Sequence, residues 1–479
     1  MGKTLKAIPL VIFICFYANG LFSQSYLGLK ESNYIGVLGA DLQPASIADS
    51  RYIVDVNISG FDVIAYNSYL GLNSSLLKLK SKVEEPDWET NYKDYLTENN
   101  KESHSLFTRV DMNLLSFMVS PNDKIAFGLS TRFRAYANID GVSNEFAKLM
   151  YENLNVPSLW EKDIFNDKLD VQAMAWFEYA ANYAQVVYDE GDHFVKAGGK
   201  LKLLQGIGAA YVFVNDFDYA YLNADTMAIY NVDVSYGHSE NISIVDNNSL
   251  AYKFESNPGL GLDLGAVYEW RPEGYKNQTL KKLKFFETAP NKYKLRAGFS
   301  ILDIGRIKYK KGGESNDFKA NIDYWNVREI DVNNVIDWDT LMNSLFVKSP
   351  NNEEYFKMNL PTVINLNVDY NLYKTFFVNL NLHNAFQFKK NENKSHEITT
   401  YTISPRWDNK YFGFSLPLTY SFLDGFRMGT GIRLGPLYVG SSNMIAVFKN
   451  KNSKGIDFYF GARVPILKRP PKDQGDSSF

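Results

Sequence analysis

The chain has 479 residues, of which 45% are hydrophobic and 15% aromatic, and its formal net charge is −3 at pH 7. It has 51 basic and 54 acidic side chains and no basic stretch with interleaved aromatic residues, which excludes the usual chemistry of nucleic-acid binding. Cys15 is the only cysteine, so disulfide frameworks, thiolate metal sites and cysteine nucleophiles are excluded once the N-terminus is removed as predicted below.

The N-terminus has the pattern of a secretory signal peptide. Lys3 and Lys6 precede the apolar run AIPLVIFICFYA, and small or polar residues follow in NGLFSQS. The run is about a dozen residues, shorter than the roughly 20 that span a bilayer as a helix. We predict that residues 1–23 are a signal peptide cleaved near Ser23–Gln24. No later stretch is long and apolar enough for a transmembrane helix, so a membrane location would require a closed barrel.

From residue 51 onward apolar and polar residues alternate in successive runs, which is the pattern of two-sided β-strands. The clearest case is PTVINLNVDYNLYKTFFVNLNLHNAF at residues 361–386, a hairpin with one apolar and one polar face. The predicted strands lie near residues 51–58, 106–114, 125–134, 177–183, 195–203, 260–269, 293–301, 364–370, 376–383, 396–404, 412–419, 426–434, 438–448 and 456–466. Residues 51–467 are therefore predicted to form an all-β, transmembrane antiparallel β-barrel of about fourteen strands, apolar toward lipid and polar toward the lumen.

The connections alternate in length, as they do in outer-membrane barrels. Long charged loops are predicted at residues 69–102, 139–169, 215–256 and 311–352, and short turns near residues 121–123, 189–192, 372–374 and 407–408. The links at 272–291 and 423–425 depart from the rule. If the strand-like residues of 215–256 joined the wall, the number of wall strands would be sixteen.

Helices are expected only within loops, at Ser143–Leu154 and Val335–Leu345. Residues 468–479 are expected to be a disordered periplasmic tail.

The polar faces of the predicted strands carry more basic than acidic residues, so we expect the lumen to attract anions such as a carboxylate head group. The candidate ligand contacts in the lumen are Arg109, Arg132, Arg134, Lys200, Lys202, Arg296, His383, Arg427, Arg433 and Arg463. The alternative is that these cations form ion pairs across a closed lumen. A surface hydrolase that uses His383 is a third hypothesis, but no spacing signature of a triad accompanies it. We therefore expect no enzyme, no cofactor and no metal site.

The residues just before the first strand carry a family resemblance. Gly36, Gly39, then Gln43, Pro44 and Ala45 resemble the start of the FadL-type outer-membrane barrels, in which Asn usually stands where this chain has Gln43. Four other stretches resemble an uncharacterised Bacteroidota branch of that group, known only as a domain of unknown function: GFSILDIGRIKY (298–309), NLPTVINLNVDYNL (359–372), GTGIRLGPLYVGSSN (429–443) and DFYFGARVPI (457–466).

The resemblance implies fourteen strands and a plug or hatch formed by residues 24–50, although an ordinary periplasmic entry strand is the alternative for that segment. It also implies the outer membrane of a Gram-negative bacterium, with lipid, lipopolysaccharide and the barrel-assembly machinery as partners. The expected function is a FadL-like channel for small hydrophobic or amphipathic solutes. The alternative is a non-conducting barrel that serves as a binding partner, scaffold or secretion-system shuttle in the envelope, like the PorV-like members.

Overall fold

The computed structural model describes residues 28–73, 92–152, 155–245, 249–252, 254–255, 257–276, 291–312, 315, 317–326, 347–349, 353–386, 395–444 and 453–467. The predicted signal peptide, the predicted tail after residue 467 and the predicted helix at Val335–Leu345 lie outside these residues. Within them, no helix has both the length and the apolar character needed to cross a membrane.

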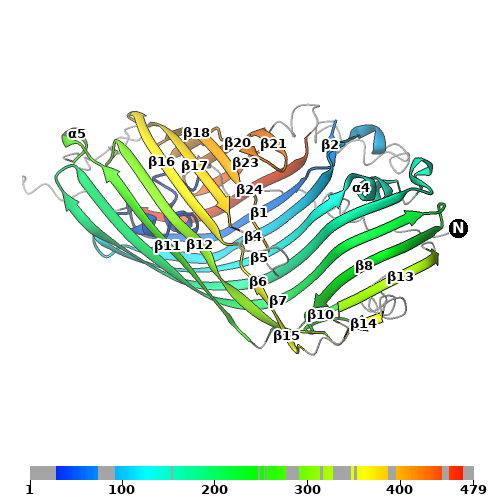
Figure 1. Ribbon diagram of the computed structural model, residues 1–479. Helices are drawn as coiled ribbons and strands as arrows, with labels where there is room; N and C mark the ends of the chain where they lie inside the picture. The colour runs from blue at the N-terminus through cyan, green and yellow to red at the C-terminus, as the bar shows by residue number, and fades with distance from the viewer. Residues whose placement is uncertain are drawn as a thin grey trace, which may run out of the picture.

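Fourteen strands of the described chain close into one antiparallel barrel (Figure 1), because the first strand pairs with both the second and the last. In hydrogen-bonded order the wall consists of β1 (Tyr52–Asn67), β4 (Ser103–Val119), β5 (Ile125–Ser143), β6 (Asp163–Glu190), β7 (His193–Tyr221), β11 (Gly259–Trp270), β12 (Leu295–Lys310), β15 (Tyr355–Asn359) with β16 (Val363–Tyr373), β17 (Phe376–Ala385), β18 (Thr400–Asp408), β19 (Phe412–Ser415) with β20 (Leu418–Ser421), β21 (Gly425–Met428) with β22 (Thr430–Leu434), β23 (Leu437–Ser441) and β24 (Gly455–Leu467). The predicted fold class and strand count are confirmed.

Three of the fourteen wall strands are interrupted, and the sequence explains the positions. Pro361 lies between β15 and β16, and Pro417 lies between β19 and β20. Proline has no backbone N–H to donate to a neighbouring strand, so a ladder breaks there. Gly429 separates β21 from β22, where a Cβ atom would stand only 2.4 Å from the Ser441 carbonyl oxygen.

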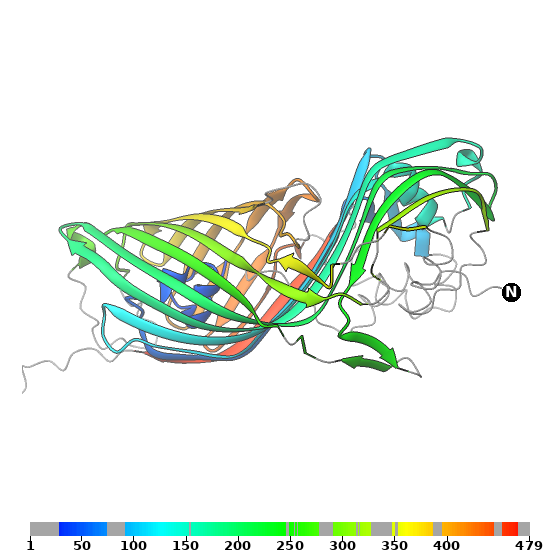
Figure 2. The same cartoon turned by 60° about the horizontal axis from the view of Figure 1, so that its bottom comes forward.

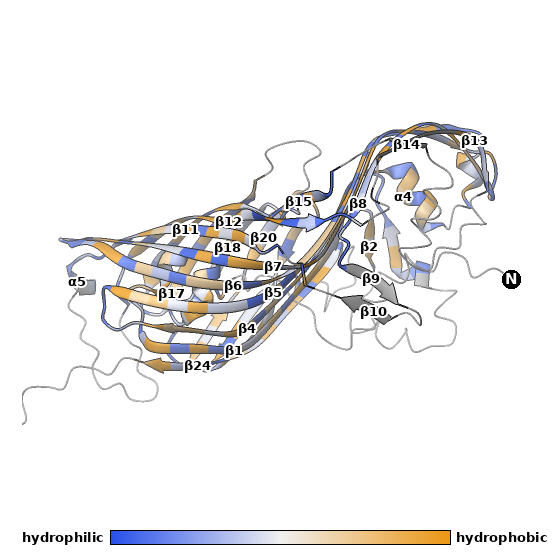
Figure 3. Cartoon of the chain, turned by 90° about the horizontal axis from the view of Figure 1, so that it is seen from below, coloured by the Kyte–Doolittle hydropathy of each residue, from blue (hydrophilic) through white to orange (hydrophobic). Residues whose placement is uncertain are grey.

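The wall is apolar outside and polar inside, and Figure 3 shows the alternation along the strands. On β16 the residues Leu366, Val368 and Tyr370 are 38–42% exposed, while Asn365 and Asp369, which alternate with them, are fully buried. Each of the fourteen wall strands carries at least one exposed large apolar side chain. An apolar surface that surrounds a closed barrel is stable in contact with lipid rather than water.

Part of the sheet continues beyond the barrel (Figure 2). Strands β6 and β7 have 28 and 29 residues, against roughly ten for a tilted membrane crossing. Strand β7 pairs with β11 through residues 193–204 and then with β8 (Thr226–His238) through residues 210–221. Strand β8 pairs with β13 (Asp317–Asn326), and β13 with β14 (Val347–Ser349). The strand-like part of residues 215–256 thus extends the sheet and adds nothing to the wall.

The remaining elements are short. The described chain has two small two-stranded sheets, β2 (Leu70–Leu72) with β3 (Leu96–Glu98), and β9 (Ile242–Val245) with β10 (Ser249–Tyr252). The helix α4 (Asn144–Tyr151) begins after Ser143, whose hydroxyl accepts a hydrogen bond from the Phe146 N–H, as predicted for that loop. The others are α5 (Glu273–Lys276) and the 3-10 helices η1 (Gly36–Asp41), η2 (Pro44–Ile47), η3 (Tyr92–Tyr95) and η4 (Pro157–Leu159).

The strand predicted at residues 396–404 is misplaced. Strand β18 begins at Thr400 and continues through Asp408, so the predicted turn at residues 407–408 is part of the strand. Residues 395–399 are irregular, with Ser395 and Glu397 buried. Polar side chains of β4 and β5 hold this segment by ion pairs and hydrogen bonds, which no periodicity of the segment itself reveals.

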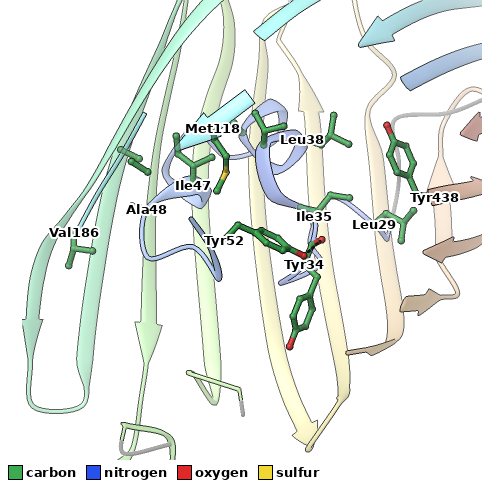
Figure 4. Packing of buried hydrophobic residues seen from close by; sticks show 14 of the residues in the cluster. Leu29, Tyr34, Ile35, Leu38, Ile47, Ala48, Tyr52, Met118, Val186 and Tyr438 are labelled. Carbon is green, nitrogen blue, oxygen red and sulfur yellow. Dashed lines mark hydrogen bonds between the residues drawn. The ribbon is translucent and has the colours of Figure 1, made fainter. Parts of the chain in front are cut away.

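Residues 28–50, called the N-terminal segment from here on, lie inside the barrel (Figure 2). Its apolar residues form a buried cluster with inward-facing wall residues (Figure 4): Leu29, Tyr34, Ile35, Val37, Leu38, Ala40, Ile47 and Ala48 pack with Tyr52, Met118, Val186, Phe194, Tyr438 and Tyr459. The barrel therefore has an internal apolar core around the N-terminal segment, separate from its outward-facing apolar surface.

Candidate functional site

The N-terminal segment is fixed by hydrogen bonds from many wall strands around the lumen. On β12 the Ser300 hydroxyl donates to the Leu42 carbonyl at 2.7 Å, and on β7 the Lys196 ammonium donates to the Ala48 carbonyl at 3.0 Å. The Ser32 hydroxyl donates to the Asp408 carboxylate of β18 at 2.9 Å. On β1, several strands away in the wall, Asp55 accepts from the Val37 N–H at 2.8 Å, so the segment contacts widely separated parts of the lumen wall.

A notch lined by glycines receives Gln43, Pro44 and Ala45. Gly198 of β7 and Gly265 of β11 are direct cross-strand partners. A Cβ atom on Gly198 would lie 2.8 Å from the Ala45 backbone, and one on Gly265 would lie 1.8 Å from the Gln43 side chain. The Gln43 amide nitrogen donates to the carbonyl oxygens of Ala266 at 3.1 Å and Phe299 at 3.0 Å. The motif residues thus approach the wall backbone more closely than a side chain would permit.

Gly36 is needed for a different reason. Its φ is +65°, in the left-handed region that glycine enters without strain. The next residue, Val37, donates its N–H to the Asp55 carboxylate at 2.8 Å, and the same carboxylate accepts from Arg463 at 3.1 Å. A Cβ on Gly36 would meet the Asp55 oxygen at 1.8 Å. Gly39 lies within η1 without a positive φ, close to Ile35 and Ser46.

Four of the predicted lumen residues, Arg132, Arg134, Lys200 and Lys202, belong to one buried ion-pair network. Glu178 of β6 is fully buried and lies within 4 Å of four cations, at 3.7 Å from Arg132, 3.4 Å from Arg134, and 3.8 Å from both Lys200 and Lys202. Acidic groups from other strands and from the N-terminal segment complete the network, namely Asp41, Asp111, Asp263 and Asp303. Buried charges are tolerated when they are paired in this way.

The network also fastens the N-terminal segment. The Asp41 carboxylate accepts from the Lys200 ammonium at 2.7 Å and lies 3.4 Å from the Arg132 guanidinium. Burial alone would raise the pKa of Asp41, but Arg132, Lys200 and Lys30 hold that pKa well below its usual range. Asp41 is therefore charged, and its two wall cations are neutralised by the segment rather than left for a solute.

The other predicted lumen cations also have protein partners. Arg109 pairs with Asp62 at 3.1 Å and Glu397 at 2.7 Å. Arg296 donates to the Glu31 carbonyl at 2.6 Å and to Asn33 at 2.9 Å. Ion pairs at 3.0–3.3 Å account for the rest: Arg427 with Asp424, Arg433 with Asp408, and Arg463 with Asp55. These pairings give each cation a protein partner, mostly on the same or a nearby strand, and the Arg109–Glu397 pair reaches across the lumen. The role of these residues as ligand contacts stays a prediction.

The alternating pattern did not predict that Asp62 and Asp303 face the lumen, because β-bulges change which residues of their strands point inward. In β1 a register shift between Asn57 and Ser59 turns the even-numbered residues inward, so Asp62 joins the lumen. In β12 the corresponding irregularity places Leu302 and Asp303 both inside, and Asp303 has a φ of +57°. The expectation of a markedly basic lumen therefore undercounted its acids, and a bulge leaves no clear signal in one sequence.

Two cavities lie on either side of the N-terminal segment, and Lys30, Glu31 and Leu42 line both. The first cavity faces the end with the long loops, and its lining includes five predicted residues: Arg109, Arg132, Arg134, Lys202 and His383. The second faces the end with the short turns and includes Arg296. Lys200, Arg427, Arg433 and Arg463 line neither. Described residues include no group of three or more His, Cys, Asp or Glu placed to hold a metal ion.

An inward-facing apolar cluster follows the first cavity toward the long loops. It includes Ile64, Tyr66, Phe107, Tyr136, Met174, Trp176, Leu204, Tyr211, Phe213, Ile307, Tyr309, Phe356, Met358, Leu360 and Ile398. Phe107 and Ile398 also line the first cavity. The interior thus changes from a charged belt beside the N-terminal segment to an aromatic and aliphatic lining at the other end of the cavity. A charged surface next to an apolar one can contact both parts of a molecule that has a polar and an apolar end.

Residues 395–399 close part of this interior. The Glu397 carboxylate accepts from Arg109 at 2.7 Å and from the Tyr136 hydroxyl at 2.6 Å. The backbone of His396 exchanges two hydrogen bonds with the Asn138 side chain, at 3.1 and 3.2 Å. The His396 ring nitrogen lies 2.7 Å from the Asp140 carboxylate. This segment, hereafter the 395–399 strap, is attached to β4 and β5 on the side of the barrel opposite its own strand.

The strap is expected to loosen as the pH rises. Burial alone would lower the pKa of His396, but the hydrogen bond and charge of Asp140 raise that pKa above its ordinary value. The stabilisation from the protonated pair is complete below the unfolded pKa of about 6.5 and is lost as the pH passes the higher folded pKa. Hydrogen exchange of residues 395–399, corrected for its intrinsic pH dependence, should lose several-fold protection over that range. In Asp140→Asn the pH dependence should vanish, and an unchanged dependence would contradict this assignment.

Comparison with known proteins supplies the family. The model described as "Family of unknown function (DUF5723)" matches residues 44–442. The chain belongs to this family. Its match begins at Pro44 in the glycine-lined notch and covers the wall through β23. A search of curated proteins found no relative that matches the chain.

Several solved structures resemble this DUF5723 chain at low identity. The toluene transporter TbuX of Ralstonia pickettii is 8% identical with a TM-score of 0.42, and the match covers 94% of this chain and 100% of that one. A deltaS2S3 mutant of the TodX monoaromatic hydrocarbon channel is 10% identical with a TM-score of 0.40, over 90% and 94% of the two chains. A Pseudomonas aeruginosa FadL homologue is 12% identical with a TM-score of 0.35, over 89% and 91%. At these values the likenesses assign no activity or ligand.

Proposed function

We propose that the chain is an outer-membrane channel of a Gram-negative bacterium that passes small hydrophobic or amphipathic solutes, with the N-terminal segment as its plug. The observation that carries the proposal is that the segment lies within the lumen between two cavities and is fastened to wall strands on several sides. A wall with an apolar surface facing outward supports the membrane location.

The interior supports the choice of solute class. The aromatic and aliphatic lining beyond the first cavity offers a surface for an apolar solute, and Lys30, Asn381 and Thr400 offer polar contacts beside it. The ion pairs of the lumen argue against selection of an anionic head group by charge alone, since most of the predicted cations already have a carboxylate partner. The proposed solute is therefore amphipathic without a required negative charge.

Uptake into liposomes tests the proposal. Liposomes that contain the chain from residue 24 onward are compared with liposomes that contain a variant lacking residues 28–50, using a neutral fluorescent amphipathic solute. We expect uptake to rise about tenfold or more in the deletion variant, because the obstruction between the cavities is gone. Heat-modifiable migration on gels checks that both barrels are folded.

The same experiment addresses the alternative function. A lack of uptake above protein-free liposomes in both folded forms would overturn the channel and favour a non-conducting barrel that binds an envelope partner. The extension of β6, β7, β8, β13 and β14 beyond the wall is the structural feature that would serve such a partner. Equal uptake by both forms would show that the barrel conducts but that the N-terminal segment is no plug.

A further inference from the structure

The lumen wall formed by β16, β17 and β18 differs from the rest of the interior because its inward side chains are mostly uncharged. Buried amides and hydroxyls follow one another across the three strands, and the set is Asn365, Asn367, Asn379, Asn381, Thr400, Thr402 and Ser404. We call this set the amide stripe. The charged belt of β4, β5, β6, β7 and β12 lies elsewhere around the barrel.

Two amides of the stripe have unmet hydrogen-bonding groups. The side-chain nitrogen and oxygen of both Asn365 and Asn381 make no hydrogen bond within the described part of the chain. Their residues are 0% and 1% exposed. A buried amide without partners is costly, so side chains of this kind usually contact ordered water or a bound molecule.

The stripe also joins the two cavities. Asn381 lines the first cavity, Asn367 lines the second, and the two residues are direct cross-strand partners in the β16–β17 ladder. Asn365 is opposite His383, another lining residue of the first cavity. A line of hydrogen-bonding groups therefore passes the N-terminal segment along the wall, from one of its sides to the other.

We propose that small neutral hydrogen-bonding solutes of the glycerol and urea class, together with water, pass along the amide stripe while the N-terminal segment stays in place. Amides and hydroxyls can replace the hydration of a neutral solute, since each offers donors and acceptors. An ion would lose its hydration beside these uncharged groups without gaining a counter-charge. This route differs from the proposed passage of amphipathic solutes, which requires the segment to yield.

Glycerol entry into liposomes tests the route. Swelling of liposomes with the chain from residue 24 onward is followed by light scattering, for the native sequence and for Asn365→Leu/Asn381→Leu. We expect the native protein to accelerate glycerol and urea entry over protein-free liposomes, and the double variant to lose at least fivefold of that rate. The matched control is Asn113→Leu, a buried asparagine of β4 that lines neither cavity, and it should retain the native rate.

A second variant keeps the test valid if the leucine variant fails to fold. The chain after the predicted signal peptide contains no cysteine, so Asn381→Cys provides a single thiol in the stripe. A bulky neutral methanethiosulfonate reagent should then block glycerol entry at least fivefold, with no effect on the native protein. Glycerol entry that is absent in the native protein, or equal in the double variant and unaffected by the thiol reagent, would overturn the route. Uptake of the amphipathic solute is measured in parallel, so that failure of the stripe is distinguished from failure of the channel.

Discussion

Replacing Glu178 with glutamine is expected to lower the free energy of unfolding of the barrel by about 3–5 kcal/mol. Glu178 is fully buried, and its carboxylate lies within 4 Å of Arg132, Arg134, Lys200 and Lys202. Glutamine keeps the size of the side chain but removes the charge that offsets the four cations. Those cations then repel one another in an interior where water cannot screen them.

Urea unfolding of the purified protein in detergent micelles measures the effect. The matched control is Glu240→Gln, because Glu240 also pairs with a lysine, Lys310, at 2.8 Å, but both side chains are 44–53% exposed. Exposed pairs contribute less than about 1 kcal/mol, so the control should unfold near the native urea concentration. An equal decrease in the free energy of unfolding in the two variants would show that the buried network contributes no more to stability than an exposed ion pair.

Replacing Gly198 with leucine is expected to force the N-terminal segment out of its notch. A Cβ atom at this position would lie 2.8 Å from backbone atoms of Pro44 and Ala45, which are held by the Gln43 hydrogen bonds and have no side-chain freedom to move aside. Overpacking of this kind costs about 1–3 kcal/mol. Release of the segment is expected, since the rest of the wall does not depend on the contact.

Thiol labelling detects the release. In the chain without residues 1–23, Ser46→Cys places one thiol in η2, where the native hydroxyl is buried beside Gly39 of the same segment. Its reaction with a polar maleimide should accelerate at least tenfold when Gly198→Leu is added. The matched control is Gly199→Leu on the same strand, where a Cβ would make only ordinary contacts, at 3.6 Å with the Leu264 side chain and 3.7 Å with the Asp263 carbonyl oxygen. Equal labelling in both leucine variants would contradict the notch.

Gly198 and Gly199 also show which features of the barrel can be predicted from the sequence and which cannot. Gly198 and Gly199 are adjacent and identical, and the period-two pattern of β7 places them on opposite faces. The pattern alone does not tell which glycine meets another segment. That requires the position of Gln43, Pro44 and Ala45, which are about 150 residues away in sequence and reach β7 only because the barrel closes around them.

The candidate site was predicted in part for the same reason. The cations of β4, β5, β7 and β12 were found because each occupies an inward position of a regular strand, and His383 was found in the same way on β17. The sequence did not identify several of the carboxylates that pair with these cations. Asp62 and Asp303 follow bulges, Glu397 lies in the irregular 395–399 strap, and Asp41 lies outside the wall.

The alternation of apolar and polar residues was enough by itself to predict an antiparallel barrel of about fourteen strands with an apolar exterior, because strand geometry sends successive side chains to opposite faces. Whether residues 215–256 would raise that number to sixteen was left open by the pattern. Only the tertiary structure decided which charges neutralise one another, where the N-terminal segment lies and which amides are left without partners. Those features depend on contacts across the lumen and on bulges that reverse the facing of a strand, and neither is a local property of the chain.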